Sequence, residues 1–310
     1  MAELDGILAF DKSPGMTSHD AIVCLRRLLL GVKIGHTGTL DPMASGLMLI
    51  CLGRATKVTQ FLTDWSKSYR AEMTLGKVSE TYDSDGQVTE GGAIPGLTQT
   101  SLQEMLTRDF TGSIRQQVPA YSAVKHQGRE LYKYARQGVE IELPEREVEV
   151  ASITVVDYAE PILSLNIDCG KGTYIRALAN DIGRILGCGA ILSKLRRLSV
   201  GPVSVSQALA LDGIAEAAKT GDLERRIIPL TQLLDFPRVN VREEATEIIR
   251  NGGYPAISQV TGYGPFRTGQ YISMISEKGT VLAIGKSRCD AASLTASPKK
   301  DFYSYVRVLI

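Results

Sequence analysis

Apolar and polar residues alternate strictly along positions 69–75, the pattern of a strand with one buried face. Four other apolar stretches have strand length, two of them before this segment and two after it. Together these patterns predict strands at residues 6–11, 47–52, 69–75, 148–156 and 162–169.

Helical spacing of apolar residues separates the predicted strands. Thr17 and Asp20 have the spacing of a capping box and precede such a series, which predicts a helix start. Ser101 and Glu104 predict a second start of the same kind, and Thr173 is the expected N-cap of a third helix. After the first helix, further helices are predicted at residues 101–110, 173–186 and 208–217.

The pattern changes after Pro229 and Pro237, which indicate a boundary. One short helix is predicted beyond it, at residues 243–250, and short apolar runs separated by glycine follow. These runs predict strands of a compact β module of the barrel kind, at residues 271–275, 281–286 and 302–308. At 310 residues the chain has room for one large domain and this small one.

Composition narrows the class of protein. The chain is 44% hydrophobic and 22% charged, which is typical of a soluble globular protein. It has no run of eighteen apolar residues and its N-terminus lacks the pattern of a secretory signal, so a cytoplasmic location without membrane attachment is expected. Five scattered cysteines without a CxxC pair and only three histidines argue against disulfides and zinc, so any catalysis is expected to need no metal.

Charge is segregated along a chain whose net charge is only +1. Residues 115–138 hold five basic residues and one acid, residues 170–200 hold six and one, and residues 77–109 hold two and six. Such segregation could build a basic face for phosphate contacts, or it could be ordinary variation on a solvated surface. Charge alone does not separate the two interpretations.

The loop at residues 35–46 reads GHTGTLDPMASG and has Asp41 as its one acid. Its glycines permit tight backbone geometry and close approach of a ligand, and Pro42 fixes the backbone after the acid. Asp41 is therefore a candidate catalytic carboxylate. The alternative is an ordinary turn in which Asp41 bonds nearby backbone N–H groups.

A second glycine-containing segment, GKGTYIR at residues 170–176, places Arg176 in the first turn of a predicted helix. A cation there opposes the helix dipole, and a carboxylate facing it would remove the conflict. Asp41 is a candidate partner for Arg176. The alternative is a solvated arginine.

These two segments belong to an ordered series that resembles the TruB family of bacterial tRNA pseudouridine-55 synthases. The other members of the series are residues 12–20, Tyr69 and the VPAYSAVK segment at residues 118–125, and the likeness covers roughly residues 6–235. The family usually has Lys-Pro-x-Gly where this chain has Lys12-Ser-Pro-Gly15, and often two prolines where it has Pro119 alone. The C-terminal part is more weakly similar to a PUA-type RNA-binding module.

The resemblance implies an α+β fold: a pseudouridine-synthase-like mixed, mainly antiparallel sheet flanked by helices, with a small C-terminal β-barrel-like (PUA-type) module. It implies a catalytic domain over residues 1–236 and a PUA-like domain over residues 237–310. Residues 115–145 correspond to an insertion that clamps the T-arm of tRNA.

The implied activity is isomerisation of uridine 55 in the T-loop of tRNA to pseudouridine. The glycosidic bond breaks, the base rotates and rejoins the sugar through C5, so no cofactor is needed. The uridine must flip out of its stack, at a cost of a few kcal/mol recovered from phosphate and stacking contacts. The partner is therefore tRNA, and a monomer without an obligate protein partner is expected.

The family's site residues map onto this chain as expectations. Asp41 is the nucleophile or base and Arg176 its ion-pair partner, while Tyr69 stacks on the target base. The remaining substrate-binding positions are His36, Tyr174, Leu195 and Lys12. For Tyr69 and Leu195 an ordinary place in the core is the alternative, and for His36 a turn.

Two other functions remain open at this point. One is a related catalytic subunit that works with guide RNA and partner proteins, which the lack of a lysine-rich C-terminal tail argues against. The other is an inactive RNA-binding or RNA-folding protein, which the intact Asp41, Tyr69 and Arg176 argue against.

Overall fold

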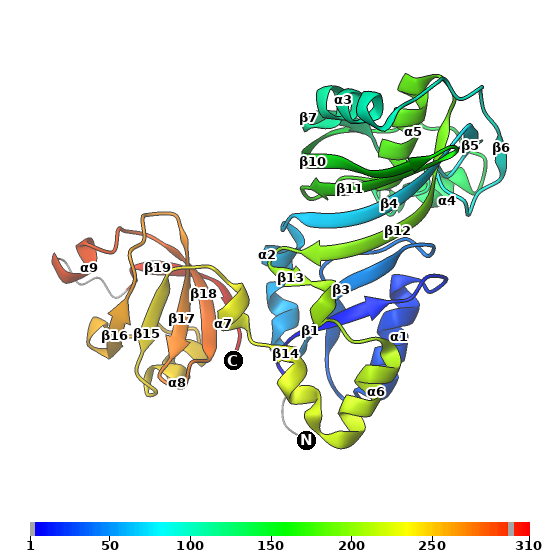
Figure 1. Cartoon of the computed structure of the whole chain (residues 1–310). Helices are drawn as coiled ribbons and strands as arrows, with labels where there is room; N and C mark the ends of the chain where they lie inside the picture. Colours follow the sequence, from blue (N-terminus) through cyan, green and yellow to red (C-terminus); the bar gives the residue numbers. More distant parts are fainter. Residues whose placement is uncertain (1–3, 297–300) are drawn as a thin grey trace.

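The computed structural model describes residues 4–296 and 301–310, which form a large sheet with helices and a smaller sheet beside it (Figure 1). In spatial order, the main path of the large sheet is β14 (Ile227–Ile228), β1 (Gly6–Lys12), β3 (Ser45–Leu52), β12 (Ala190–Val200), β4 (Lys67–Leu75), β11 (Ile162–Cys169), β10 (Glu145–Ala159) and β7 (Gly112–Gln117). Two short strands lie off this path: β2 (Ile34–His36) pairs with β3, and β13 (Val203–Ser204) pairs with β12.

Pairing in this sheet is antiparallel except between β3 and β12. That parallel contact joins the two halves of the sheet next to the predicted loop at residues 35–46. In it, Arg196 lies opposite Ser45 and Arg197 lies opposite Gly46. The mixed, mainly antiparallel sheet flanked by helices is therefore confirmed.

Helices cover one face of the large sheet. Alternate strand residues such as Leu8 and Phe10 point into a core that also contains Leu25 and Leu178 from the helices. The principal helices on this face are α1 (Ser18–Leu28), α3 (Gln99–Phe110), α5 (Ile175–Leu186) and α6 (Leu211–Thr220). The other strand residues, such as Ile7 and Ala9, belong to a second apolar cluster on the opposite face.

Short elements complete this part of the chain. They are η1 (Gly53–Val58), α2 (Thr59–Thr63), β5 (Lys77–Ser79), β6 (Val88–Glu90), β8 (Lys125–His126), β9 (Arg129–Glu130), α4 (Leu131–Ala135), η2 (Val205–Gln207), η3 (Asp222–Arg226) and α7 (Leu230–Leu233). Of these, β8, β9 and α4 lie within the predicted insertion. None of the described helices is both long enough and apolar enough to cross a membrane.

The smaller sheet has the order β16 (Val260–Tyr263), β15 (Arg238–Val241), β17 (Tyr271–Ser276), β18 (Val281–Ser287) and β19 (Tyr303–Val308). It is accompanied by α8 (Ala245–Arg250), η4 (Ile257–Gln259) and α9 (Ser293–Ala296). A separate C-terminal β module is thus confirmed, although its described strands form an open sheet and not a closed barrel. Edge strands β16 and β19 do not pair with one another in the described part of the chain.

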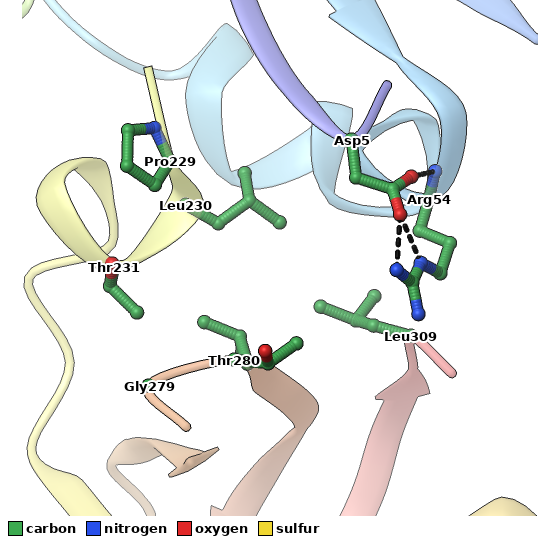
Figure 2. A pocket seen from close by; sticks show the side chains of 9 residues that line it. Asp5, Arg54, Pro229, Leu230, Thr231, Gly279, Thr280 and Leu309 are labelled. Atoms are coloured by element: carbon green, nitrogen blue, oxygen red, sulfur yellow. Dashed lines mark hydrogen bonds and ion pairs between the residues drawn. The ribbon is translucent and has the colours of Figure 1, made fainter. Parts of the chain in front are cut away.

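The second apolar cluster joins the two sheets. Ile284 and Leu309 from the C-terminal module belong to the same cluster as Leu47 and Leu49 of β3. Beside it lies a crevice of about 220 Å³, in which Asp5 pairs with Arg54 opposite residues of the C-terminal module (Figure 2). The module is therefore packed against the large sheet through apolar side chains.

Three predicted helix starts differ from the structure. The second helix begins one turn earlier than expected, because Thr98 and not Ser101 is its N-cap, with Ser101 completing the capping box. The expected cap Thr173 instead donates to the Gly170 carbonyl, and Tyr174 is the N-cap of α5. The helix expected at residues 208–217 begins at Leu211.

Candidate active site

The loop that carries Asp41 connects β2 to β3 and is fixed by the segment that leads into α1. The Ser18 hydroxyl donates to the Leu40 carbonyl and accepts from the Leu40 N–H, both at 2.9 Å. The Gly15 N–H donates to the Pro42 carbonyl at 2.9 Å. Both contacts come from the segment around the start of α1, so the capping box that begins this helix also determines where the loop lies.

Asp41 and Arg176 form a bidentate ion pair. Arg176 Nε lies 2.9 Å from Asp41 Oδ2, and one terminal nitrogen lies 3.1 Å from Oδ1. The arginine side chain is 5% exposed, whereas the aspartate side chain is 33% exposed. The pair therefore presents a carboxylate that solvent or substrate can reach, held from behind by a buried guanidinium.

The remaining donors of Arg176 are bonded as well. They reach the Thr81 carbonyl and the Tyr121 carbonyl, each at 3.0 Å. Tyr121 belongs to the predicted insertion, so this arginine connects the insertion directly to the loop of Asp41. A guanidinium with its hydrogen bonds satisfied in this way has a fixed orientation.

A second carboxylate, Asp83, belongs to the same group. Its Oδ2 lies 3.4 Å from Arg176 Nε, and its Oδ1 accepts from the Asp85 N–H at 3.0 Å. Asp83 is buried, and its charge together with burial and Asp41 raises the pKa of Asp85, with burial the largest cause. No local spacing in the sequence indicates this role of Asp83, because its ion pair is with a residue distant in sequence.

Tyr69 lies on β4 with its ring buried. Burial raises the pKa of Tyr69, while the positive charge of Arg197, which lies opposite it across β4 and β12, acts in the opposite direction. Leu195, on the neighbouring strand β12, belongs to the same apolar cluster as Tyr69. The two residues are thus brought together in the apolar core.

His36 ends β2 and lines a cavity of about 480 Å³ that also contains Asp41. Burial lowers the pKa of His36, and the charge of Arg197 lowers it further, so the ring is neutral at pH 7. Its Nδ1 is buried and has no hydrogen-bond partner in the described part of the chain. The ring therefore has a buried polar atom without a partner, next to the cavity that the residue lines.

Lys12 is fully buried below the same loop. Its Nζ donates to the carbonyls of Met16 at 2.6 Å, Ser13 at 3.0 Å and Pro42 at 3.3 Å. Burial lowers the pKa of Lys12, and Asp41 opposes this shift. With its three donors used, the ammonium supports the loop and does not face the cavity.

Gln116, at the start of the insertion, holds the beginning of α5. Its side-chain amide donates to the Tyr174 carbonyl at 3.0 Å and accepts from the Tyr174 N–H at 2.7 Å. This pair of bonds replaces the cap that was predicted for Thr173, and it fixes the backbone two residues before Arg176. The sequence contained no signal for it, since a lone glutamine has many possible partners.

We expect Gln116→Leu to lower the free energy of unfolding by about 1–3 kcal/mol, because Tyr174 loses both partners in a buried place. Urea denaturation measures this loss. Gln103→Leu is a matched control, since Gln103 makes the same two kinds of bond, to Ile153 and Val155, away from Arg176. If Gln116 also orients Arg176, only Gln116→Leu slows catalysis; equal activity of the two variants would contradict that role.

The predicted basic face is unevenly supported. Of the six basic residues in residues 170–200, Arg197 is buried and the other five form ion pairs with acids. In the insertion, Lys125 and Arg136 are exposed, and Arg129 and Arg136 lie over the rings of Tyr134 and Tyr132. The structure therefore concentrates available positive charge, interleaved with aromatic rings, on the insertion.

No group of three or more potential metal ligands occurs among the described residues. The site consists of a loop carboxylate and a neutral histidine that line one cavity, a buried arginine that holds the carboxylate, and a buried tyrosine on β4. This arrangement can place a reactive carboxylate next to an aromatic ring and a ring nitrogen.

Two family models match this chain. The N-terminal domain model of the TruB family of pseudouridylate synthases matches residues 26–175, and the C-terminal domain model of tRNA pseudouridylate synthase B matches residues 176–235. The tRNA pseudouridine synthase B of Syntrophus aciditrophicus is 41% identical over 286 residues, covering 91% of each chain. That of Xanthomonas oryzae pv. oryzae is 40% identical over 284 residues, covering 89% of this chain and 92% of its own.

Solved structures agree at the level of the fold. A chain in the structure of an H/ACA RNP bound to a substrate RNA containing 2′-deoxyuridine superposes with a TM-score of 0.75 at 23% identity. The superposition covers 99% of this chain and 86% of that one. Both family models and relatives of this identity and coverage lead to one conclusion: the chain belongs to the TruB family of pseudouridylate synthases.

Proposed function

We propose that this chain isomerises uridine 55 in the T-loop of tRNA to pseudouridine, with Asp41 as the catalytic carboxylate. The observation that carries the proposal is the bidentate pair of Asp41 with buried Arg176, which leaves the carboxylate a third exposed at a cavity. Family membership and the activity for which the relatives are named, that of tRNA pseudouridine synthase B, supply the reaction.

Asp41 acts on the flipped nucleotide as nucleophile or base. Three routes use this carboxylate: addition to the base, addition to the sugar, or removal of the C2′ proton. In each of them a negative charge next to the anomeric carbon stabilises the positive charge that develops when the glycosidic bond breaks. Arg176 keeps the Asp41 carboxylate oriented, and Asp83 adds a second negative charge beside the guanidinium.

The other site residues bind the base. Tyr69 offers one ring face to the uracil, Tyr174 and Leu195 line its pocket, and His36 contacts the RNA through its free nitrogen. Lys12 acts indirectly, because its ammonium donates a hydrogen bond to the Pro42 carbonyl and so holds the loop of Asp41. No cofactor takes part.

The chain divides by function into a catalytic domain at residues 1–236 and a PUA-like RNA-binding domain at residues 237–310. Residues 115–145 clamp the T-arm, and their exposed basic and aromatic side chains suit a phosphate backbone with accessible bases. The enzyme works as a cytoplasmic monomer without an obligate protein partner.

Tritium release from tRNA that contains [5-³H]uridine tests the activity. The purified chain alone should release tritium from a bare transcript, and a transcript with cytidine at position 55 should release none. Release only after addition of guide RNA and further proteins would identify a subunit of a larger enzyme. Binding of the transcript without any release would identify an inactive RNA-binding protein.

Affinity for tRNA should fall steeply with salt, because lysine and arginine release counterions from the phosphates they neutralise. Three phosphate contacts, by Lys125, Arg129 and Arg136, predict a slope of about −3 in log K against log salt, or roughly a 40-fold loss between about 50 and 200 mM. Filter binding over that range measures the slope. Replacing the three by glutamine should flatten it, while Lys219→Gln on α6 should not; a flat wild-type slope would contradict the basic face.

A further inference from the structure

A buried guanidinium without an ionic partner lies beside the loop of Asp41. Arg197, on β12, is 2% exposed, and no carboxylate pairs with it among the residues that the structure describes. An unpaired buried charge is destabilising unless hydrogen bonds satisfy it. The hydrogen bonds of Arg197 therefore indicate the role of this buried charge beside the loop of Asp41.

The guanidinium of Arg197 bonds both ends of the catalytic loop. Its Nε donates to the Leu47 carbonyl at 2.6 Å, directly after the loop. Its terminal nitrogens donate to the carbonyls of Gly38 at 3.2 Å and Thr39 at 3.5 Å, where the loop begins. One planar group thus connects the entry of the loop to its exit, with Asp41 between them.

The backbone of Arg197 is equally constrained. Arg197 pairs with Gly46 in the parallel contact of β12 with β3. A Cβ on Gly46, which has φ +102°, would lie 2.3 Å from the Arg197 carbonyl oxygen. The two strands therefore approach closely at this point, and the arginine cannot shift without moving the loop.

Arg197 also lies opposite Tyr69 in the antiparallel pairing of β12 with β4. It thus joins the loop of the proposed catalytic carboxylate to the strand position whose ring is proposed to stack on the base. Arg176 holds the Asp41 carboxylate itself, and Arg197 holds both ends of its loop. A guanidinium offers donors in a planar fork that can reach several carbonyls together.

We propose that Arg197 is a positioning residue, which fixes Asp41 and Tyr69 relative to each other through its bonds to both ends of the loop and its place opposite Tyr69 in the sheet. The inference rests on the proposed function. Arg197 does not touch the substrate, because it is covered by the carbonyls that it binds. Its loss should therefore slow the reaction and leave the affinity for tRNA nearly unchanged.

Arg197→Lys and Arg197→Met test this role, with single-turnover pseudouridine formation at saturating tRNA and the Kd for tRNA as separate measurements. Lysine keeps the charge, but its donors sit on a single nitrogen and cannot span the two ends of this loop as the guanidinium does, so we expect the rate constant to fall about 100-fold, as a small misplacement of a reacting group produces. Arg197→Met should be slower still. In both, Kd should stay within about threefold of wild type, and amides of residues 37–44 should exchange faster with deuterium.

Arg54→Lys is the matched control. Arg54 is partly buried and forms an ion pair with Asp5, but it lies at the crevice between the modules. Should Arg197→Met fail to fold, Arg197→Lys remains decisive. A folded Arg197→Lys with the wild-type rate constant, or a loss confined to Kd, would overturn the inference. A wild-type chain that forms no pseudouridine in tRNA would instead overturn the proposed function.

Discussion

Asp41→Asn should abolish tritium release, with a rate at least about 10⁴-fold below wild type, because an amide is neither a nucleophile nor a base at this position. The fold should persist, since Arg176 keeps Asp83 and the carbonyls of Thr81 and Tyr121 as partners. Binding of tRNA should persist as well. Single-turnover release and filter binding with the same preparation measure the two quantities.

Asp64→Asn is the control for this substitution. Asp64 is an exposed aspartate whose ion pair is with Lys171 on the surface, so its loss should leave the rate unchanged. Wild-type release from Asp41→Asn would remove this carboxylate from the mechanism, whatever its contact with Arg176.

Arg176→Met should be the most destabilising single change at the site. It leaves Asp41 and the buried Asp83 without their shared cation, and breaking a buried pair from one side costs about 3–5 kcal/mol. Release of tritium should cease, because nothing then orients the Asp41 carboxylate. Urea denaturation of the folded protein measures the loss of free energy of unfolding.

Two further variants separate charge from geometry. Arg176→Lys should fold and remain impaired by about 100-fold, since an ammonium cannot bind a carboxylate in two places. Arg184→Met, on the same helix with a side chain 77% exposed, should change stability by less than about 0.5 kcal/mol. An Arg176→Met protein as stable as wild type would show that the two carboxylates do not need this cation.

Local patterns predicted the elements well where periodicity is strong. The strand expected at residues 162–169 is β11 with the same bounds, and the strictly alternating residues 69–75 lie in β4. The capping box of Thr17 and Asp20 is present as predicted. Strands β15 and β16 were missed, because each has only four residues, and four residues are too few to show a periodic pattern.

The site was predicted only in part. The pairing of Asp41 with Arg176 is confirmed by its geometry, but the burial of the arginine was not expected from its place beside the apolar stripe. Asp83, Gln116 and Arg197 act through partners distant in the sequence, and no local spacing encodes such contacts. They became recognisable only once strand pairing had brought their segments together.

A ribosome delivers Leu47 and Leu49 long before Ile284 and Leu309, yet all four residues share one apolar cluster. The part of this surface that Ile284 and Leu309 cover therefore stays exposed during most of synthesis, and exposed apolar surface favours chaperone binding and aggregation. A premature stop codon ahead of β18 would leave that part exposed permanently, even though every residue around Asp41 had already been made.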